Sequence, residues 1–122
     1  MTPMLQNDLY RLVSVTGSDG EWEARIDLCP ESAIYAAHFK GMPVTPGACL
    51  VEMACELASE AAGEDLDVCE AADIRFLRPI LPDRTTSLAF RLERPAPGLP
   101  ASWSVQILDG EDLCARMKLI LG

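Results

Sequence analysis

A chain of 122 residues is long enough for one hydrophobic core and too short for two, so residues 1–122 are expected to form a single domain. Hydrophobic residues make up 49% of the chain and charged residues 24%, which excludes a disordered composition. The formal net charge of −9 disfavours binding to nucleic acid or to an anionic membrane, and the lack of a long apolar run or a signal-peptide pattern favours a cytoplasmic protein.

The cysteines argue against a metal site and against a disulfide framework. Their number is odd, none has C-x-x-C spacing, and the chain holds a single histidine. We therefore expect no bound metal and five reduced thiols, mostly buried. These residues are Cys29, Cys49, Cys55, Cys69 and Cys114.

The first part of the chain predicts a β-hairpin. Residues 8–15 are strand-like, residues 17–20 (Gly-Ser-Asp-Gly) are typical of a turn, and residues 22–28 alternate strictly between apolar and polar side chains. Two antiparallel strands joined by a tight turn follow from this pattern.

One long helix is predicted next, and it is the only helix that the sequence indicates clearly. Apolar residues from 50 to 61 fall at helical spacing, and Gly63 is a plausible end. Val51 and Cys55 widen the apolar arc, as expected of a helix around which a sheet wraps. The glutamates occupy the other side of the helix: Glu52, Glu56 and Glu60.

The second half of the chain reads as strands throughout. Asp109-Gly110 predicts a hairpin turn, and three prolines in residues 95–100 predict a loop. The side chains expected to face the core are Leu88, Phe90, Leu92, Trp103, Val105 and Ile107. The predicted strands cover residues 68–78, 85–94, 101–108 and 112–121. Two strands, a long helix and four strands indicate an α+β fold with an antiparallel sheet.

The segment from His38 to Glu52 combines a titratable base, rigid backbone and an acid. The two titratable residues are fourteen positions apart. Prolines and glycines between them predict a stiff loop and tight backbone geometry. These residues are Gly41, Pro43, Pro46 and Gly47.

Removal of water from a 3-hydroxyacyl thioester needs the groups that this segment supplies. A base must take the proton from C2, a dipole must stabilise the thioester oxygen, and an acid must protonate the departing hydroxyl. His38 suits the base, and the free N–H of Gly47 would lie at the positive end of the helix dipole. Glu52 suits the acid only if burial or a neighbouring carboxylate keeps it protonated, and an exposed pair with Glu56 contributes only a few tenths of a kcal/mol. A turn histidine and a solvated glutamate would be the structural alternative.

The pattern H-F-x-G-x-P-V-x-P-G, followed by a carboxylate at the fourteenth position after the histidine, resembles the signature of the 3-hydroxyacyl-[acyl carrier protein] dehydratases. The stretch IRFLRPILP at residues 74–82 is similar to a later strand motif of that family. The resemblance implies a hotdog fold, in which a curved antiparallel sheet wraps around one long central helix. It also implies activity in fatty-acid, polyene or polyketide type synthesis.

The resemblance further implies the roles of individual residues. His38 would be the base, Gly47 would polarise the thioester carbonyl, and Glu52 would be the acid supplied by the other subunit of a homodimer. The substrate would arrive on the phosphopantetheine of acyl carrier protein through a tunnel at the dimer interface, without a metal or redox cofactor. The substrate-binding residues would be Phe39, Gly41, Pro43, Val44, Pro46 and Phe76. Further tunnel walls would come from Leu50, Met53 and Leu77, and the carrier protein would dock on Arg75, Arg78 and Arg84.

Three departures from the family pattern suggest a divergent member. Lys40 replaces a proline, Glu56 stands where glutamine is common, and Asp83-Arg84 replaces a Gly-Asp pair. A higher even oligomer, or a heterodimer with a paralogue, is an alternative to the homodimer. Two other functions stay open: a hotdog thioesterase in which Glu52 activates water, and a non-catalytic partner subunit of a dehydratase.

Overall fold

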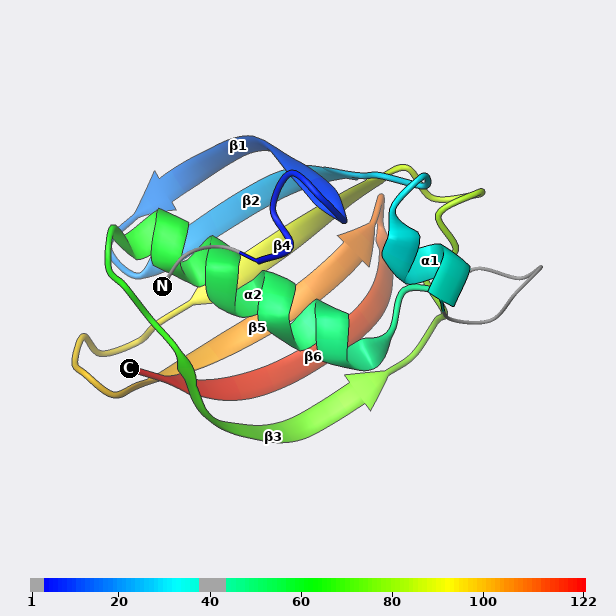
Figure 1. The fold of residues 1–122 in the computed structure, drawn as a ribbon. Coiled ribbons are helices and arrows are strands. Elements are labelled where there is room, and N and C mark those ends of the chain that lie inside the picture. Colours follow the sequence, from blue (N-terminus) through cyan, green and yellow to red (C-terminus); the bar gives the residue numbers. More distant parts are fainter. Residues whose placement is uncertain (1–3, 38–43) are drawn as a thin grey trace.

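The computed structural model describes residues 4–37 and 44–122, and within these ranges the chain forms one antiparallel sheet and two helices (Figure 1). Their order agrees with the predicted order, except for a short helix before the long one. The elements are β1 (Tyr10–Ser18), β2 (Glu21–Leu28), α1 (Ala33–Ala37), α2 (Gly47–Ala62), β3 (Val68–Phe76), β4 (Ser87–Glu93), β5 (Ala101–Asp109) and β6 (Asp112–Leu121).

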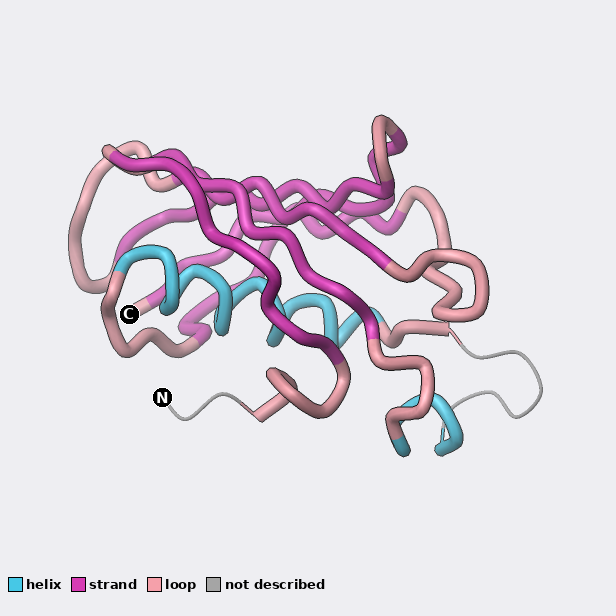
Figure 2. The backbone as a smooth tube through the Cα atoms, turned by 90° about the horizontal axis from the view of Figure 1, so that it is seen from above, coloured by secondary structure: helices cyan, strands magenta, loops and turns pink. Residues whose placement is uncertain are grey.

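The sheet has the strand order β1-β2-β4-β5-β6-β3, and every neighbouring pair is antiparallel. Strand β3 therefore forms one edge, where β6 is its only partner among the described strands. Figure 2 shows α2 running along one face of the curved sheet. This is the hotdog arrangement, and it confirms the predicted α+β class.

Alternation along the strands places the predicted apolar side chains between the sheet and α2. On β5, Trp103, Val105 and Ile107 are at most 1% exposed. The predicted inward residues of β4 are buried as well, and Phe90 pairs across the sheet with Ile107. Because strand side chains alternate between faces, the opposite face of the sheet carries most of the polar residues.

Helix α2 begins and ends where the sequence predicts. Pro46 precedes the first helical residue, with a φ of −61° that its ring imposes. Gly63 ends the helix in the left-handed region, with a φ of 66°, and its N–H donates to the carbonyl of Ser59. Met53 and Leu57 are fully buried, so the apolar side of the helix completes the core.

Two expectations were wrong. The sequence did not indicate α1, because five residues are too few for a helical period to become visible; Ser32 Oγ accepts from the N–H of Ile34 at 3.3 Å at its start. Glu56 was placed on the polar side of the long helix and treated as part of an exposed pair with Glu52, but it is only 2% exposed. The chain segment before β1 covers that side of α2, as the close-range contacts below show.

Neither described helix combines the length and the apolar character that a membrane-crossing segment would need.

Candidate active site

Several predicted site residues lie outside the described residues. These are the predicted base His38 and three predicted substrate-binding residues, Phe39, Gly41 and Pro43. Their roles stay predictions.

The residues on either side of this stretch are fixed to each other. The hydroxyl groups of Tyr35 in α1 and Thr45 are 2.9 Å apart, and both residues are buried. The N–H of Thr45 also donates to the carbonyl of Ile80 at 2.9 Å. These two bonds join α1, the entry to α2 and the connection from β3 to β4 at one end of the molecule.

A cavity of about 400 Å³ lies beside the first turn of α2. Most of the described residues that the sequence assigned to the substrate site or tunnel contribute to its wall: Val44, Pro46, Gly47, Leu50, Phe76 and Leu77. Met53 does not line it, because this side chain is fully buried in the core. Thr45 and Ile80 line it without having been predicted. The mainly apolar wall suits a hydrocarbon chain.

Gly47 is held under the ring of Phe76. A Cβ atom at this position would lie 2.6 Å from Cζ of Phe76, which is too close for any other residue without a shift of the ring. Pro46 provides no side-chain cap, and no acceptor for the N–H of Gly47 is found in the described part of the chain. A free donor at the positive end of a helix, next to an apolar cavity, can stabilise an oxygen atom that gains negative charge.

Glu52 has the properties of an acid rather than of a solvated surface carboxylate. Its Oε1 is buried and has no hydrogen-bond partner among the described residues. Burial is the largest cause that raises the pKa of Glu52, followed by the negative charge of Glu56, a side-chain hydrogen bond with Glu56, and the charge of Asp67. Glu52 does not line the cavity beside Gly47 of its own chain.

Glu56 accepts three hydrogen bonds from the segment that precedes β1 and one from Tyr10, the first residue of β1. The N–H groups of Met4 and Leu5 donate to Oε2 at 3.1 and 3.0 Å. The N–H of Gln6 and the hydroxyl of Tyr10 donate to Oε1, each at 3.0 Å. Burial, and then the charge of Glu56, raise the pKa of Tyr10. Sequence reasoning missed this cluster, because no local pattern shows that a segment about fifty positions away packs against this side of α2.

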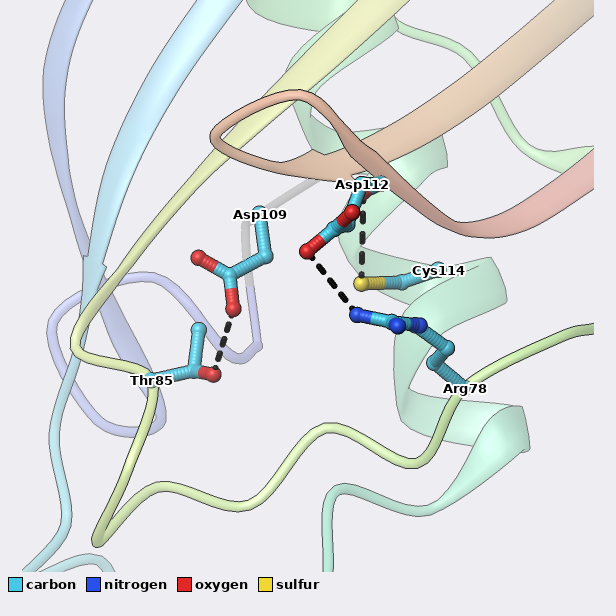
Figure 3. A network of polar contacts seen from close by, with 5 residues as sticks. All are labelled: Arg78, Thr85, Asp109, Asp112 and Cys114. Atoms are coloured by element: carbon cyan, nitrogen blue, oxygen red, sulfur yellow. Dashed lines mark hydrogen bonds and ion pairs between the residues drawn. The ribbon is translucent and has the colours of Figure 1, made fainter.

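The three predicted docking arginines lie in different surroundings. Arg78 lines the cavity, and its Nη1 lies 2.8 Å from Oδ2 of Asp112 in an exposed ion pair (Figure 3). Arg75 lies opposite Arg116 across the β3–β6 pair and lines a different cavity. Arg84 is exposed in the connection between β3 and β4. Of the three, Arg78 is the one next to the cavity wall.

A second hydrogen bond in Figure 3 attaches the end of the β3–β4 connection to the β5–β6 hairpin. Thr85 Oγ1 donates to Oδ2 of Asp109 at 2.9 Å, in the turn between β5 and β6. The Sγ atom of Cys114 lies 3.7 Å from the backbone carbonyl of Asp112. The side-chain carboxylate of the same residue forms the ion pair with Arg78. The β5–β6 turn therefore holds both ends of the β3–β4 connection.

Within residues 4–37 and 44–122, no group of three or more His, Cys, Asp or Glu side chains is arranged to hold a metal ion.

Comparison with known protein families gives one match over most of the chain. The model of the ApeI-like family, described as ApeI dehydratase, matches residues 14–117. No curated protein matches the chain in sequence.

Solved structures share the fold at low sequence identity. A chain of the dehydratase heterocomplex ApeI:P from Xenorhabdus doucetiae has a TM-score of 0.72 at 13% identity, covering 91% of this chain and 96% of that chain. An uncharacterized protein from Erwinia carotovora subsp. atroseptica has a TM-score of 0.68 at 22% identity, covering 92% of each chain. A hypothetical thioesterase with coenzyme A from Streptococcus pneumoniae has a TM-score of 0.65 at 13% identity, covering 92% and 83%. At such identities these structures establish the hotdog fold alone.

Proposed function

Because the chain belongs to the ApeI-like dehydratase family, we propose that it removes water from a 3-hydroxyacyl thioester carried on acyl carrier protein. The product is the trans-2-enoyl thioester. The proposal makes the protein a hydro-lyase of fatty-acid, polyene or polyketide type synthesis.

In the proposed reaction, two proton transfers accompany the loss of the hydroxyl group. His38 takes the proton from C2 of the substrate, and the electron pair of that C–H bond forms the C2–C3 double bond. The N–H of Gly47 donates a hydrogen bond to the thioester oxygen, which gains negative charge as C2 loses its proton. Glu52 gives its proton to the C3 hydroxyl, which leaves as water when the C3–O bond breaks.

The buried Oε1 of Glu52, which has no partner among the described residues, is the observation that carries the proposal. An acid must hold its proton at working pH, and burial together with the charge of Glu56 raises the pKa of this carboxyl group. Its buried Oε1 is not engaged by another group in the described part of the chain, so the carboxyl is free to act on a substrate. A thioesterase would need an ionised Glu52 that activates water, and the raised pKa of this carboxyl group supports the dehydratase over that alternative.

The proposal requires a second chain, and the exposed edge of the sheet supports it. Glu52 lies away from the cavity of its own Gly47, as expected if the acid acts on a substrate bound to another protomer. Strand β3 is exposed over nearly its whole length, and Ile74, Phe76 and Leu77 are 36%, 54% and 53% exposed. An unpaired strand edge with apolar side chains is a template for pairing with another strand. We propose a homodimer, or a higher even oligomer built from such dimers.

The proposed substrate needs no metal or redox cofactor from the protein, because the phosphopantetheine arm of the carrier protein presents it. An acidic carrier protein would dock by charge complementarity near the cavity, where Arg78 is the best placed of the predicted arginines. Arg84 and Arg75 are expected to contribute less.

Mass spectrometry of carrier-bound 3-hydroxyacyl groups of several chain lengths tests the proposal, with loss of one water as the signal. We expect the wild-type protein to dehydrate at least one substrate, and His38→Ala and Glu52→Ala each to abolish the loss while the protein keeps its fold and oligomeric state. Full activity in either variant would reject the assigned roles.

Two other outcomes of the same experiment would replace the proposal. Release of free thiol without loss of water would identify a thioesterase. Inactivity of the isolated protein on every substrate, together with isolation as a complex with a different hotdog chain, would identify a non-catalytic partner subunit. Light scattering on the purified protein separates a homodimer from a monomer that awaits a paralogue.

A further inference from the structure

The segment at residues 4–10 crosses α2 at Glu56 and supplies every hydrogen bond that this carboxylate is seen to accept. Three donors are successive backbone N–H groups and the fourth is the Tyr10 hydroxyl. A carboxyl group that accepts at both oxygens from four donors shows the bonding pattern of the ionised form, which has only acceptors. Because Glu56 is 2% exposed, water cannot replace these donors.

Glu52 lies one helical turn before Glu56 on α2, and a hydrogen bond between the two carboxyl groups is one of the causes that raise the pKa of Glu52. Two carboxyl groups can form such a bond only if one of them carries a proton. The oxygens of Glu56 already accept four bonds, so a proton shared by the two carboxyl groups would lie on Glu52. The other end of Glu52 keeps Oε1 buried and without a partner among the described residues.

We propose that Glu56 is a positioning residue for Glu52: the segment at residues 4–10 holds Glu56 as a charged acceptor, and Glu56 in turn keeps the proton on Glu52 and orients its carboxyl group. The catalytic use of that proton rests on the proposed function, but the coupling between the two carboxyl groups does not. The N-terminal segment that packs against α2 then has a second role, because it prepares Glu52 as the acid.

The charged groups that act on Glu52 all raise its pKa. On α2, Glu56 and then Asp67 in the connection to β3 are the charged groups that act on Glu52, and both raise its pKa after burial does. From β1, Tyr10 faces the pair and is influenced by Glu56, Glu60 and Glu52 in that order. No cation is among these groups, so nothing in this set offsets the negative charge of Glu56.

Carbon-13 NMR of protein labelled at the glutamate side-chain carboxyl carbon tests the coupling without any assay of activity. The Glu52 signal is assigned by its absence in Glu52→Gln. In Glu56→Gln we expect Glu52 to titrate at a pH lower than in the wild type by about one unit or more, because a neighbouring negative charge is removed. Glu60→Gln removes the same charge from an exposed position one turn further along α2 and is expected to leave the Glu52 titration unchanged.

Glutamine has one side-chain oxygen, so Glu56→Gln also loses bonds to the N-terminal segment and will lower stability. Tyr10→Phe is a milder variant that removes one of the four donors. The loss of this donor weakens the hold of the N-terminal segment on Glu56, and Glu52 is expected to titrate at lower pH, by less than in Glu56→Gln. A Glu52 signal that titrates as in the wild type in each of these variants that folds would overturn the proposal.

The pH dependence of dehydration gives the second readout. If Glu52 is the acid, the alkaline limb of kcat/KM should move to lower pH in Glu56→Gln by the same amount as the NMR titration, while activity at lower pH persists. A purely structural role for Glu56 would lower thermal stability and leave this limb in place. If no substrate loses water but the Glu52 titration still shifts, the proposed function fails and the coupling stands; if water is lost but neither readout shifts, the coupling fails alone.

Discussion

The two ends of helix α2 differ in how completely their polar groups are satisfied. At the C-terminal end, the N–H of Gly63 donates to the carbonyl of Ser59, and Ser59 Oγ donates to the carbonyl of Cys55 at 2.9 Å and accepts from the N–H of Leu66 at 3.3 Å. At the N-terminal end, the N–H of Gly47 has no described acceptor and borders a cavity. The closed end stabilises the fold, whereas the open end leaves a donor for a ligand.

The same contrast recurs one turn apart in the middle of the helix. Glu56 is saturated by four donors, and Glu52 keeps a buried oxygen atom without a described partner. Two glutamates on one helix therefore have different surroundings, because the N-terminal segment covers only Glu56. Substitutions at the open and closed positions should have different consequences, in activity for the former and in stability for the latter.

The largest effect is expected at the open end. Gly47→Ala places a methyl group against Phe76, so the ring or the backbone must move, and we expect this to disturb the N–H that is proposed to face the thioester oxygen. Loss of one oxyanion donor typically lowers the rate by about 10²- to 10³-fold. We expect a decrease of this order in kcat, measured by loss of water from a carrier-bound substrate. The double variant Gly47→Ala, Phe76→Ala should recover part of the activity if the clash is the cause, and no recovery would show that the methyl group itself blocks the site.

Glu56→Ala should cause the largest loss of stability. It leaves the buried N–H of Leu5 and the buried hydroxyl of Tyr10 without their acceptor, and we expect a decrease in the free energy of unfolding of roughly 2 to 4 kcal/mol. Urea denaturation measures it. Glu60→Ala, an exposed carboxylate on the same helix, is the matched control and should change stability by less than about 0.5 kcal/mol. Equal losses in both variants would mean that the bonds to the N-terminal segment do not stabilise the fold.

A smaller effect concerns the pH dependence of stability. The pKa of Glu52 is raised in the folded state above its ordinary value of 4.5, so its protonated form favours the folded state. This contribution is complete below pH 4.5 and is lost as the pH rises through the higher folded-state pKa. Glu52→Gln should therefore gain stability relative to the wild type as the pH increases towards neutrality, while it loses dehydration. Urea midpoints at a series of pH values give the comparison, and parallel curves for the two proteins would contradict it.

The smallest effect is expected at the closed end. Gly63→Ala puts a side chain at a φ of 66°, a conformation that costs an alanine about 1 kcal/mol, although the space around this position is open. Activity should stay at the wild-type level because Gly63 is remote from the cavity. Thermal unfolding and the dehydration assay together check both halves of this expectation, and a drop in activity at a temperature where the variant is folded would contradict it.

Most of the secondary structure could be predicted because its signals are local. Alternation along residues 22–28 and 101–108 identified strands, and helical spacing with Pro46 and Gly63 at its ends located α2. The short helix α1 was not predicted, because no helical period can be recognised over five residues. The site could be predicted in part: Gly47, Phe76 and Val44 do line one cavity, whereas Arg75 lines another.

The amino-acid sequence by itself determined the order of the strands and the long helix, the inward faces, and the spacing of fourteen positions between a histidine and a carboxylate. Only the tertiary structure decided which glutamate is buried and satisfied, which sheet edge stays open, and that a phenylalanine covers the first glycine of α2. The reason is physical: periodicity and turn chemistry act between neighbours in the chain, whereas the bonds of Glu56 join residues about fifty positions apart. Such contacts exist only after the sheet has wrapped around the helix and brought the N-terminal segment against it.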